Sequence, residues 1–319
     1  MSQSDRQAVR LVSGAVLALC LSLAPPVGAA PPAPAVTSFV PAIAYTYSSS
    51  NATDLRLANE AGTAAILVFR QANAMQFDLS PQAAHRIAYV ASNTVGGNNA
   101  TVQYKVWDTS SGSVTLGPAN TIFTTSRSIG GLDFSPDGGR LAFGSSEYYE
   151  SKLDVYDFSN PAAGAVTILS GWRVLHVRWR ADGQAIYFTG YRAGTNDPIK
   201  VYEVAADGSG VPTPLFDVAT GTNPVFDASR PSVIGFDKVL IDYRPISSGP
   251  VYLRAYNRDG SYLQLGEGSD GHYNCSNDRI IYTEYAVRKP RTLIGNADLT
   301  FSSVWSTDSN IRRTDWMPC

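Results

Sequence analysis

The hydrophobic positions of this chain come in short runs rather than in helical stripes. From residue 37 onward the runs are rich in Val, Ile, Tyr and Phe, and Gly, Asn, Asp and Pro separate them. In the clearest stretch, the runs 132–134 and 140–143 flank the turn 135–139, and the runs 152–157 and 165–169 follow. Alternating apolar runs bounded by such turn residues predict antiparallel β-strands.

The same order of four runs recurs with a period of about 47 residues. Two independent alignments support this period. The second-strand anchors are Tyr45, Tyr89, Phe143, Phe188, Ile241 and Tyr282, and the third-strand anchors are Leu57, Trp107, Tyr156, Tyr202, Tyr256 and Trp305. Four strands per unit at this period are typical of a propeller, in which each sheet covers the faces of its neighbours. We therefore predict an all-β, six-bladed β-propeller with four-stranded blades.

The two ends of the repeat region complement each other. The first unit begins with a second strand near 41–47, and the sixth unit ends with a strand at 311–314 after a long loop from Ala286 to Thr300. Residues 315–319 align with 132–136, so we expect the C-terminal strand to complete blade one. Such a closure removes an exposed sheet edge.

Composition and charge narrow the setting of the protein. The chain has 16% charged and 44% hydrophobic residues, which excludes an intrinsically disordered protein. Its net charge of −2 gives no excess of basic residues of the kind that binds nucleic acid. Arg6 and Arg10 precede the apolar run 11–24, as in a secretory signal peptide ending at residue 29. The alternative is that this N-terminal segment remains as an uncleaved membrane anchor. We expect an exported monomer, periplasmic or extracellular, with no membrane insertion after cleavage, a Pro/Ala linker at 30–36 and the propeller at 37–319.

Cysteine usage allows one cross-link at most after cleavage. Cys275 and Cys319 are the two cysteines outside the signal segment. They either form a disulfide that fixes the C-terminus, since exported proteins keep such bonds, or remain two thiols.

Specific motifs resemble those of a known family. The sequence from Phe134 to Phe143, which contains Ser-Pro-Asp-Gly-Gly, is similar to the repeat of the TolB-like six-bladed propellers, as are 200–209 and 304–314. The resemblance covers 37–319 and implies a propeller of the bacterial cell envelope that binds a protein or peptide. Propellers of this type also occur attached to serine peptidases and lyases. The N-terminal α/β domain of TolB itself has no counterpart here.

One position repeats just before the anchor of each inner strand. It is occupied by Asp78, Asp133, Arg178, Val225, Asn274 and Asp315. If these side chains converge on the axis, Asp78, Asp133 and Asp315 either bind a hard cation such as Ca²⁺ or are neutralised locally, by capping turns or by pairing with Arg178. His176 and His272 could also approach the channel, although solitary histidines are more often structural.

Loops between second and third strands offer a binding face. Tyr and Arg are frequent at interface hot spots, so our candidates are Tyr148, Tyr149, Tyr191, Arg192, Arg288 and Arg291. No Gly-x-Ser-x-Gly motif is present. We therefore expect a non-enzymatic binding module with no cofactor. The alternatives are a lyase- or hydrolase-type enzyme acting on a carbohydrate or small substrate at the channel mouth, with or without a metal, and a structural module. Clustered His and acid at the axis with shifted pKa values would favour the enzyme.

Overall fold

The computed structural model divides into residues Met1–Thr37 and Ser38–Cys319. All described residues belong to the second unit. They are 39–49, 51–72, 76–92, 99–111, 113–126, 128–147, 150–217, 232–234, 238–243, 250–274, 278–284, 291–296 and 302–316. The predicted signal peptide and linker therefore lie outside them.

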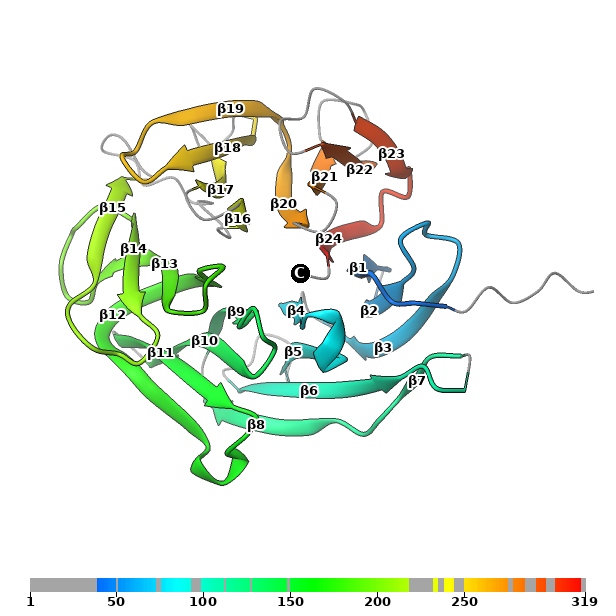
Figure 1. Ribbon diagram of the computed structural model, residues 1–319, viewed down its shortest axis with the longest axis horizontal. Coiled ribbons are helices and arrows are strands. Elements are labelled where there is room, and N and C mark those ends of the chain that lie inside the picture. The colour runs from blue at the N-terminus through cyan, green and yellow to red at the C-terminus, as the bar shows by residue number, and fades with distance from the viewer. Residues whose placement is uncertain are drawn as a thin grey trace, which may run out of the picture. The chain divides into compact units, whose positions relative to one another are not determined.

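The described residues form an all-β, propeller-like ring of antiparallel sheets (Figure 1). Their helical structure is limited to two 3₁₀ turns, Gln82–Ala84 and Pro161–Ala163. In this part of the chain no helix has the length and apolar character to cross a bilayer.

Five sheets make up the ring. The first runs in the order β24 (Ile311–Trp316), β1 (Ile43–Ser48), β2 (Thr53–Ala58) and β3 (Ala65–Gln71). The second contains β4 (Phe77–Leu79), β5 (Arg86–Ser92), β6 (Ala100–Asp108) and β7 (Thr115–Leu116), with β8 (Asn120–Thr125) also paired to β6. The third contains β9 (Ile129–Phe134), β10 (Arg140–Glu147), β11 (Glu150–Asp157), β12 (Ala165–Trp179), β13 (Ala185–Arg192), β14 (Lys200–Ala205) and β15 (Thr213–Asp217). The fourth contains β16 (Ser232–Ile234), β17 (Lys238–Tyr243), β18 (Tyr252–Asn257) and β19 (Tyr262–Glu267). The fifth contains β20 (Ser269–Asn274), β21 (Arg279–Glu284), β22 (Arg291–Asn296) and β23 (Ser302–Ser306).

The topology gives five sheets rather than six separate blades because β12 is one continuous strand of 15 residues. Residues 165–172 of β12 pair with β11, whereas residues 172–179 pair with β13, so Trp172 pairs with both strands. The sequence pattern could not distinguish one long strand from two, since Ser170 and Gly171, just before the partner changes, are turn-forming residues.

The second-strand register is confirmed for all six anchors, each of which lies in the second strand of its repeat. Five third-strand anchors are also confirmed, but Trp305 is wrong: it lies on β23, the fourth strand of its sheet. The third strand there is β22, inside the segment 286–300 for which the sequence predicts a loop. Leu293 and Ile294 are its only large apolar residues, too short a run to indicate a strand.

The predicted closing strand is confirmed. β24 pairs antiparallel with β1, with Trp316 opposite Ile43 and Thr314 opposite Tyr45. It begins earlier than expected, because 311–314 belong to β24 and not to the fourth strand of the sixth unit.

Hydrophobic packing joins each sheet to the next. One cluster combines Ile43 on β1, Ile87 on β5 and Ile281 on β21, so it links three sheets. Further clusters join β5 to β10, β13 to β17 and β17 to β21. The second strands are covered on both faces, which explains why residues 185–190 are buried continuously rather than in alternation.

Candidate functional site

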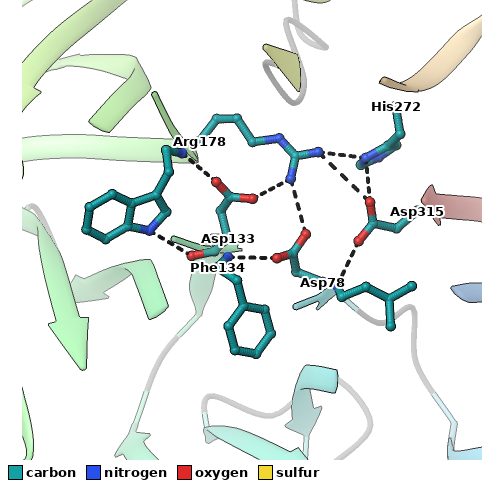
Figure 2. Close-up of polar contacts among 8 residues, drawn as sticks. Asp78, Asp133, Phe134, Arg178, His272 and Asp315 are labelled. Carbon is teal, nitrogen blue, oxygen red and sulfur yellow. Dashed lines mark hydrogen bonds and ion pairs between the residues drawn. The ribbon is translucent and has the colours of Figure 1, made fainter. Parts of the chain in front are cut away.

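Three aspartates on inner strands converge on one arginine at the axis of the ring (Figure 2). Asp78 lies on β4, Asp133 on β9 and Asp315 on β24, and each is at least 96% buried. Arg178 comes from β12. The structure thus brings together four of the six residues that occupy the repeated inner-strand position. Val225 lies outside the described residues.

Each of these aspartates also holds the inner strand of the next repeat. Asp315 Oδ2 accepts a hydrogen bond from the Leu79 backbone N–H at 2.9 Å, and Asp78 Oδ2 accepts one from the Phe134 N–H at 2.7 Å. Asp133 Oδ2 accepts one from the Trp179 N–H. Because donor and acceptor occupy equivalent positions, these bonds form a series of clasps from β24 to β4, β9 and β12. The sequence pattern predicts that these aspartates bind a cation, cap their own turns or pair with Arg178, and it does not predict this series of hydrogen bonds.

Arg178 bridges the remaining carboxylate oxygens. Its Nη1 donates to Asp133 Oδ1 and to Asp78 Oδ1, the latter at 3.1 Å. Its Nη2 lies 4.0 Å from Asp315 Oδ1. A planar guanidinium with several fixed donors suits such a shared position better than a lysine ammonium.

His272 on β20 is the fifth member of the cluster, in place of the Asn274 expected from the sequence. β20 pairs with β21 so that His272 faces Ile281, as Asp133 faces Ala142 in its own sheet. Asn274 lies two residues beyond that position. The nine-residue offset from the second strand would have identified His272, but the Pro-Asp-Gly turn that marks the end of β9 is missing after β20.

The ring of His272 can assume two roles. Its Nδ1 lies 2.7 Å from Asp315 Oδ1 and 2.7 Å from Arg178 Nη2. A protonated Nδ1 donates to Asp315, whereas a bare Nδ1 accepts from Arg178, so the nitrogen serves one partner at a time.

Burial and crowding separate the pKa values of the three carboxyls. Burial, together with the charges of Asp315 and Asp133, raises the pKa of Asp78 well above its ordinary value. Burial also raises the pKa of Asp133, to about 6, although Arg178 opposes the shift. For Asp315 the His272 ring and Arg178 outweigh burial and lower the pKa to about 2. The raised pKa values of Asp78 and Asp133 favour their protonated forms, which lowers the carboxylate charge that Arg178 and His272 face.

A small pocket opens beside this cluster. It holds about 30 Å³, room for about two water molecules, and Asp78, His272, Thr314 and Asp315 are among its lining residues. The Thr314 hydroxyl is buried and has no hydrogen-bond partner among the described residues. His176, the other histidine expected near the channel, also lines the pocket.

The loop candidates lie elsewhere, at the ends of second and third strands. Tyr191 and Arg192 end β13, where the Arg173 guanidinium lies 5.9 Å from the Tyr191 ring centre and Arg192 is exposed. Arg291 begins β22, and its Nε forms a 2.5 Å ion pair with Glu284. Tyr148, Tyr149 and Arg288 lie outside the described residues, as do Cys275 and Cys319.

No group of three or more His, Cys, Asp or Glu residues within the described ranges is arranged to hold a metal ion. At the axis the Arg178 guanidinium stands between Asp78 and Asp133. A Ca²⁺ ion coordinated by these carboxylates would require Arg178 to move away.

Comparison with known proteins identifies the fold. Neither a protein-family model nor a curated protein matches this chain. Among solved structures, TolB from Acinetobacter baumannii is similar with a TM-score of 0.66 and 21% sequence identity, over 88% of this chain and 68% of that one. The fold is a TolB-like propeller.

Two further structures share this fold at lower similarity. A chain of a nidogen/laminin complex matches the TolB-like propeller with a TM-score of 0.56 and 9% identity, over 88% of this chain and all of that one. An oligogalacturonate lyase in complex with manganese matches with a TM-score of 0.52 and 12% identity, over 79% of this chain and 73% of the lyase.

Proposed function

We propose that this chain is an exported, non-enzymatic propeller of the bacterial cell envelope that binds a protein or peptide. The proposal rests on the hydrogen bonds and ion pairs that already occupy the axial aspartates. All six carboxylate oxygens of Asp78, Asp133 and Asp315 lie against an inner-strand N–H, Arg178 or His272. Groups that hold the ring together in this way are poorly suited to move protons to and from a substrate.

The sequence resemblance and the fold support the envelope setting. TolB-like propellers are periplasmic proteins, and the predicted signal peptide at 1–29 agrees with export. The match to a chain of a nidogen/laminin complex supports protein binding by this architecture. We further propose six blades, with β12 serving as outer strand of the third and inner strand of the fourth, and a monomeric propeller at 37–319.

We place the partner on the face formed by the hairpins between second and third strands. Tyr191, Arg192 and Arg291 lie at these hairpins, and the proposal extends to Tyr148, Tyr149 and Arg288, which occupy the same kind of position in the sequence. Tyr and Arg supply large contact area together with hydrogen bonding.

The test is selection of binders from a displayed random-peptide library, followed by calorimetry with the synthetic peptides. Replacing Tyr191 and Arg192 with Ala should weaken binding at least tenfold. The control is Arg258→Ala, because Arg258 follows β18 at a hairpin between third and fourth strands. Peptides that bind all variants equally, or no selectable binder, would contradict the proposal.

A metal-dependent enzyme is the second candidate. It is favoured by the clustering of His272 with three acids of shifted pKa, the feature that we associated with catalysis, and by the similarity to a manganese-bound lyase. Native mass spectra before and after a chelator would detect Ca²⁺ or Mn²⁺ held by Asp78, Asp133 and Asp315. They would also report a Cys275–Cys319 disulfide. Turnover of oligogalacturonate with added Mn²⁺ would establish the enzyme; we expect none.

A further inference from the structure

Arginine side chains in the described structure usually have a hydrogen-bond acceptor. A carboxylate, carbonyl or amide oxygen accepts from Arg56, Arg70, Arg86, Arg140, Arg178, Arg180, Arg254, Arg258, Arg279 and Arg291. The exceptions are Arg173 and Arg192, whose side chains are exposed and whose guanidinium groups have no acceptor among the described residues. Both lie at the same end of the β12–β13 pair, where Arg173 faces Tyr191 and Arg192 faces Trp172. The unused donors are therefore gathered at one place on the proposed binding face.

The Tyr191 ring orients the Arg173 guanidinium without using its donors. The Arg173 Cζ lies 5.9 Å from the ring centre, within the range of a cation–π contact. Arg86 contacts the Phe158 ring in a similar way, but it also donates to the Gly138 carbonyl at 2.9 Å. A guanidinium has five N–H donors and no acceptor. Those of Arg173 therefore remain available to a group that the partner supplies.

Arg192 extends from a fixed stretch of backbone. The Ala193 N–H donates to the Gly171 carbonyl of β12 at 3.0 Å, and the Thr195 hydroxyl lies 2.8 Å from the Arg192 carbonyl oxygen. The same hydroxyl lies 2.8 Å from Oδ2 of Asp197, the acidic residue of this hairpin. In the described structure Asp197 forms no ion pair with Arg192 or Arg173. The hairpin therefore leaves both positive charges uncompensated.

A carboxylate suits both arginines. The planar fork of a guanidinium matches the two oxygens of a carboxylate, and such pairs form short, charge-assisted hydrogen bonds. Residues directly opposite each other on paired strands share one face of the sheet. Arg173 and Tyr191 therefore lie on one face and Arg192 on the other, so each arginine would take a carboxylate of its own.

We propose that Arg173 and Arg192 bind carboxylate groups of the partner peptide, with Tyr191 orienting Arg173. The inference rests on the proposed function and gives the partner an acidic character at the point of contact. The carboxylates come from Asp or Glu side chains or from a free C-terminus. Arg173 was not among the residues that the sequence indicated, because it lies on an inner strand and not in a loop.

The arginine Nε–H signals of the full chain, labelled with ¹⁵N-arginine, provide the readout. Acetyl-(Glu-Ala)₄-amide should shift the Arg173 and Arg192 signals saturably at millimolar concentration. It should leave Arg258 unchanged, because Arg258 follows β18 at the other end of the strands and pairs with Glu203. Acetyl-(Gln-Ala)₄-amide, which lacks the charges, should shift none of them. The glutamine peptide with a free C-terminus tests whether a chain end is bound as well.

Two glutamine variants provide a matched pair, with the Arg192 signal as the common readout. Arg173→Gln should weaken binding of the glutamate peptide about tenfold, the effect of losing a hydrogen bond between charged groups. Arg258→Gln removes an equally charged, exposed side chain and should leave binding unchanged. Arg173→Gln breaks no hydrogen bond that the described residues make through this side chain, so it should fold. Arg173→Lys should bind with intermediate affinity, because it keeps the charge and loses the fork.

Three results would overturn the proposal: no shift of Arg173 and Arg192 by the glutamate peptide, equal binding of the glutamate and glutamine peptides, or equal binding by Arg173→Gln and the unchanged protein. Inorganic phosphate that shifts both signals as strongly as the peptide would also overturn it, because the site would then bind anions in general. If library peptides bind the face of Tyr191 and Arg192 without any need for acidic residues, the carboxylate site is wrong and the proposed function stands. If no peptide binds, both are wrong.

Discussion

At the scale of single residues, Arg178 supplies the positive charge that compensates the buried carboxylates at the axis of the ring. It is the only cationic side chain other than His272 that the described structure brings to Asp78, Asp133 and Asp315, and 15% of its side chain is exposed. Removing one partner of a buried ion pair is costly because the other charge remains buried without compensation. The three carboxyls would then repel one another as well.

Replacing Arg178 with Met should therefore lower the free energy of unfolding by about 3–5 kcal/mol, measured by urea denaturation at pH 7. The control is Arg180→Met. Arg180 pairs with Asp182 and Glu203 nearer the surface, and its loss should cost about 1 kcal/mol or less. Equal losses in the two variants would mean that the axial network is not a buried ion cluster.

The raised pKa of Asp133 predicts an unusual dependence on pH. Between pH 4 and 6 the native state keeps the Asp133 proton, with a pKa of about 6, while the unfolded state, with a pKa near 3.8, releases it. The free energy of unfolding should thus fall as pH rises through this window, by up to about 3 kcal/mol.

Unfolding free energies at pH 4, 5, 6 and 7 test this expectation, and Asp133→Asn should flatten the profile. Below pH 4 the sign reverses. The pKa values of Asp315 and Asp54 are lowered to about 2, so their stabilising contribution is lost as pH falls from 4 to 2. A profile that rises steadily from pH 4 to 7 in the unchanged protein would contradict the raised pKa.

At the scale of strands, the repeat was predictable wherever a turn motif fixed its phase. Ser135-Pro136-Asp137-Gly138 carries its own geometry: Gly138 has φ +67° and the Asp137 Oδ1 accepts the Gly139 N–H at 2.9 Å. That turn made the ends of β9 and β10 predictable from the sequence, and with them the position of Asp133. β20 has no such turn, so His272 was missed in favour of Asn274. β22 was missed because its apolar run is short.

The clasps between inner strands could not have been predicted from spacing alone. They depend on the offset between neighbouring strands, which sets the Asp78 carboxylate against the Phe134 N–H rather than against its own turn. Sequence periodicity reports which residues are equivalent, but not how far one repeat is displaced along the axis from the next.

The pairing of β12 with β13 can be tested with two glycines. A Cβ at Gly190 would lie 2.1 Å from the Arg173 carbonyl oxygen, across the β12–β13 pair, so Gly190→Ala should cost more than about 3 kcal/mol. Gly171 has φ +75° and a Cβ added there would have no neighbouring atom within 4 Å, so Gly171→Ala should cost only about 1–2 kcal/mol of backbone strain. Thermal unfolding of both variants distinguishes them, and a milder effect at Gly190 would argue against the pairing.

At the scale of the whole propeller unit, one strand from each end of the chain closes the ring. Truncation after Asn310 removes β24 and with it Asp315, and leaves β1 with an open edge. We expect the melting temperature to fall by roughly 10 °C or more, and the exposed edge to promote association.

Truncation after Trp316 is the matched control, because it keeps β24 but removes Cys319. Calorimetry and size-exclusion chromatography of the two truncations separate strand closure from a disulfide. If both forms melt alike, pairing of β24 with β1 does not hold the ring.

The pairing of Ile43 with Trp316 also determines when the molecule can finish folding. A ribosome needs tens of seconds to synthesise the residues between them, at roughly 5–20 residues per second. Throughout that time β1 has no partner on its inner side, and Asp315 is not yet present to hold Leu79. Ring closure is therefore a late event of biogenesis. The nascent chain carries an open β-edge until β24 has been made, and a chaperone that covers extended segments would act on it during this interval.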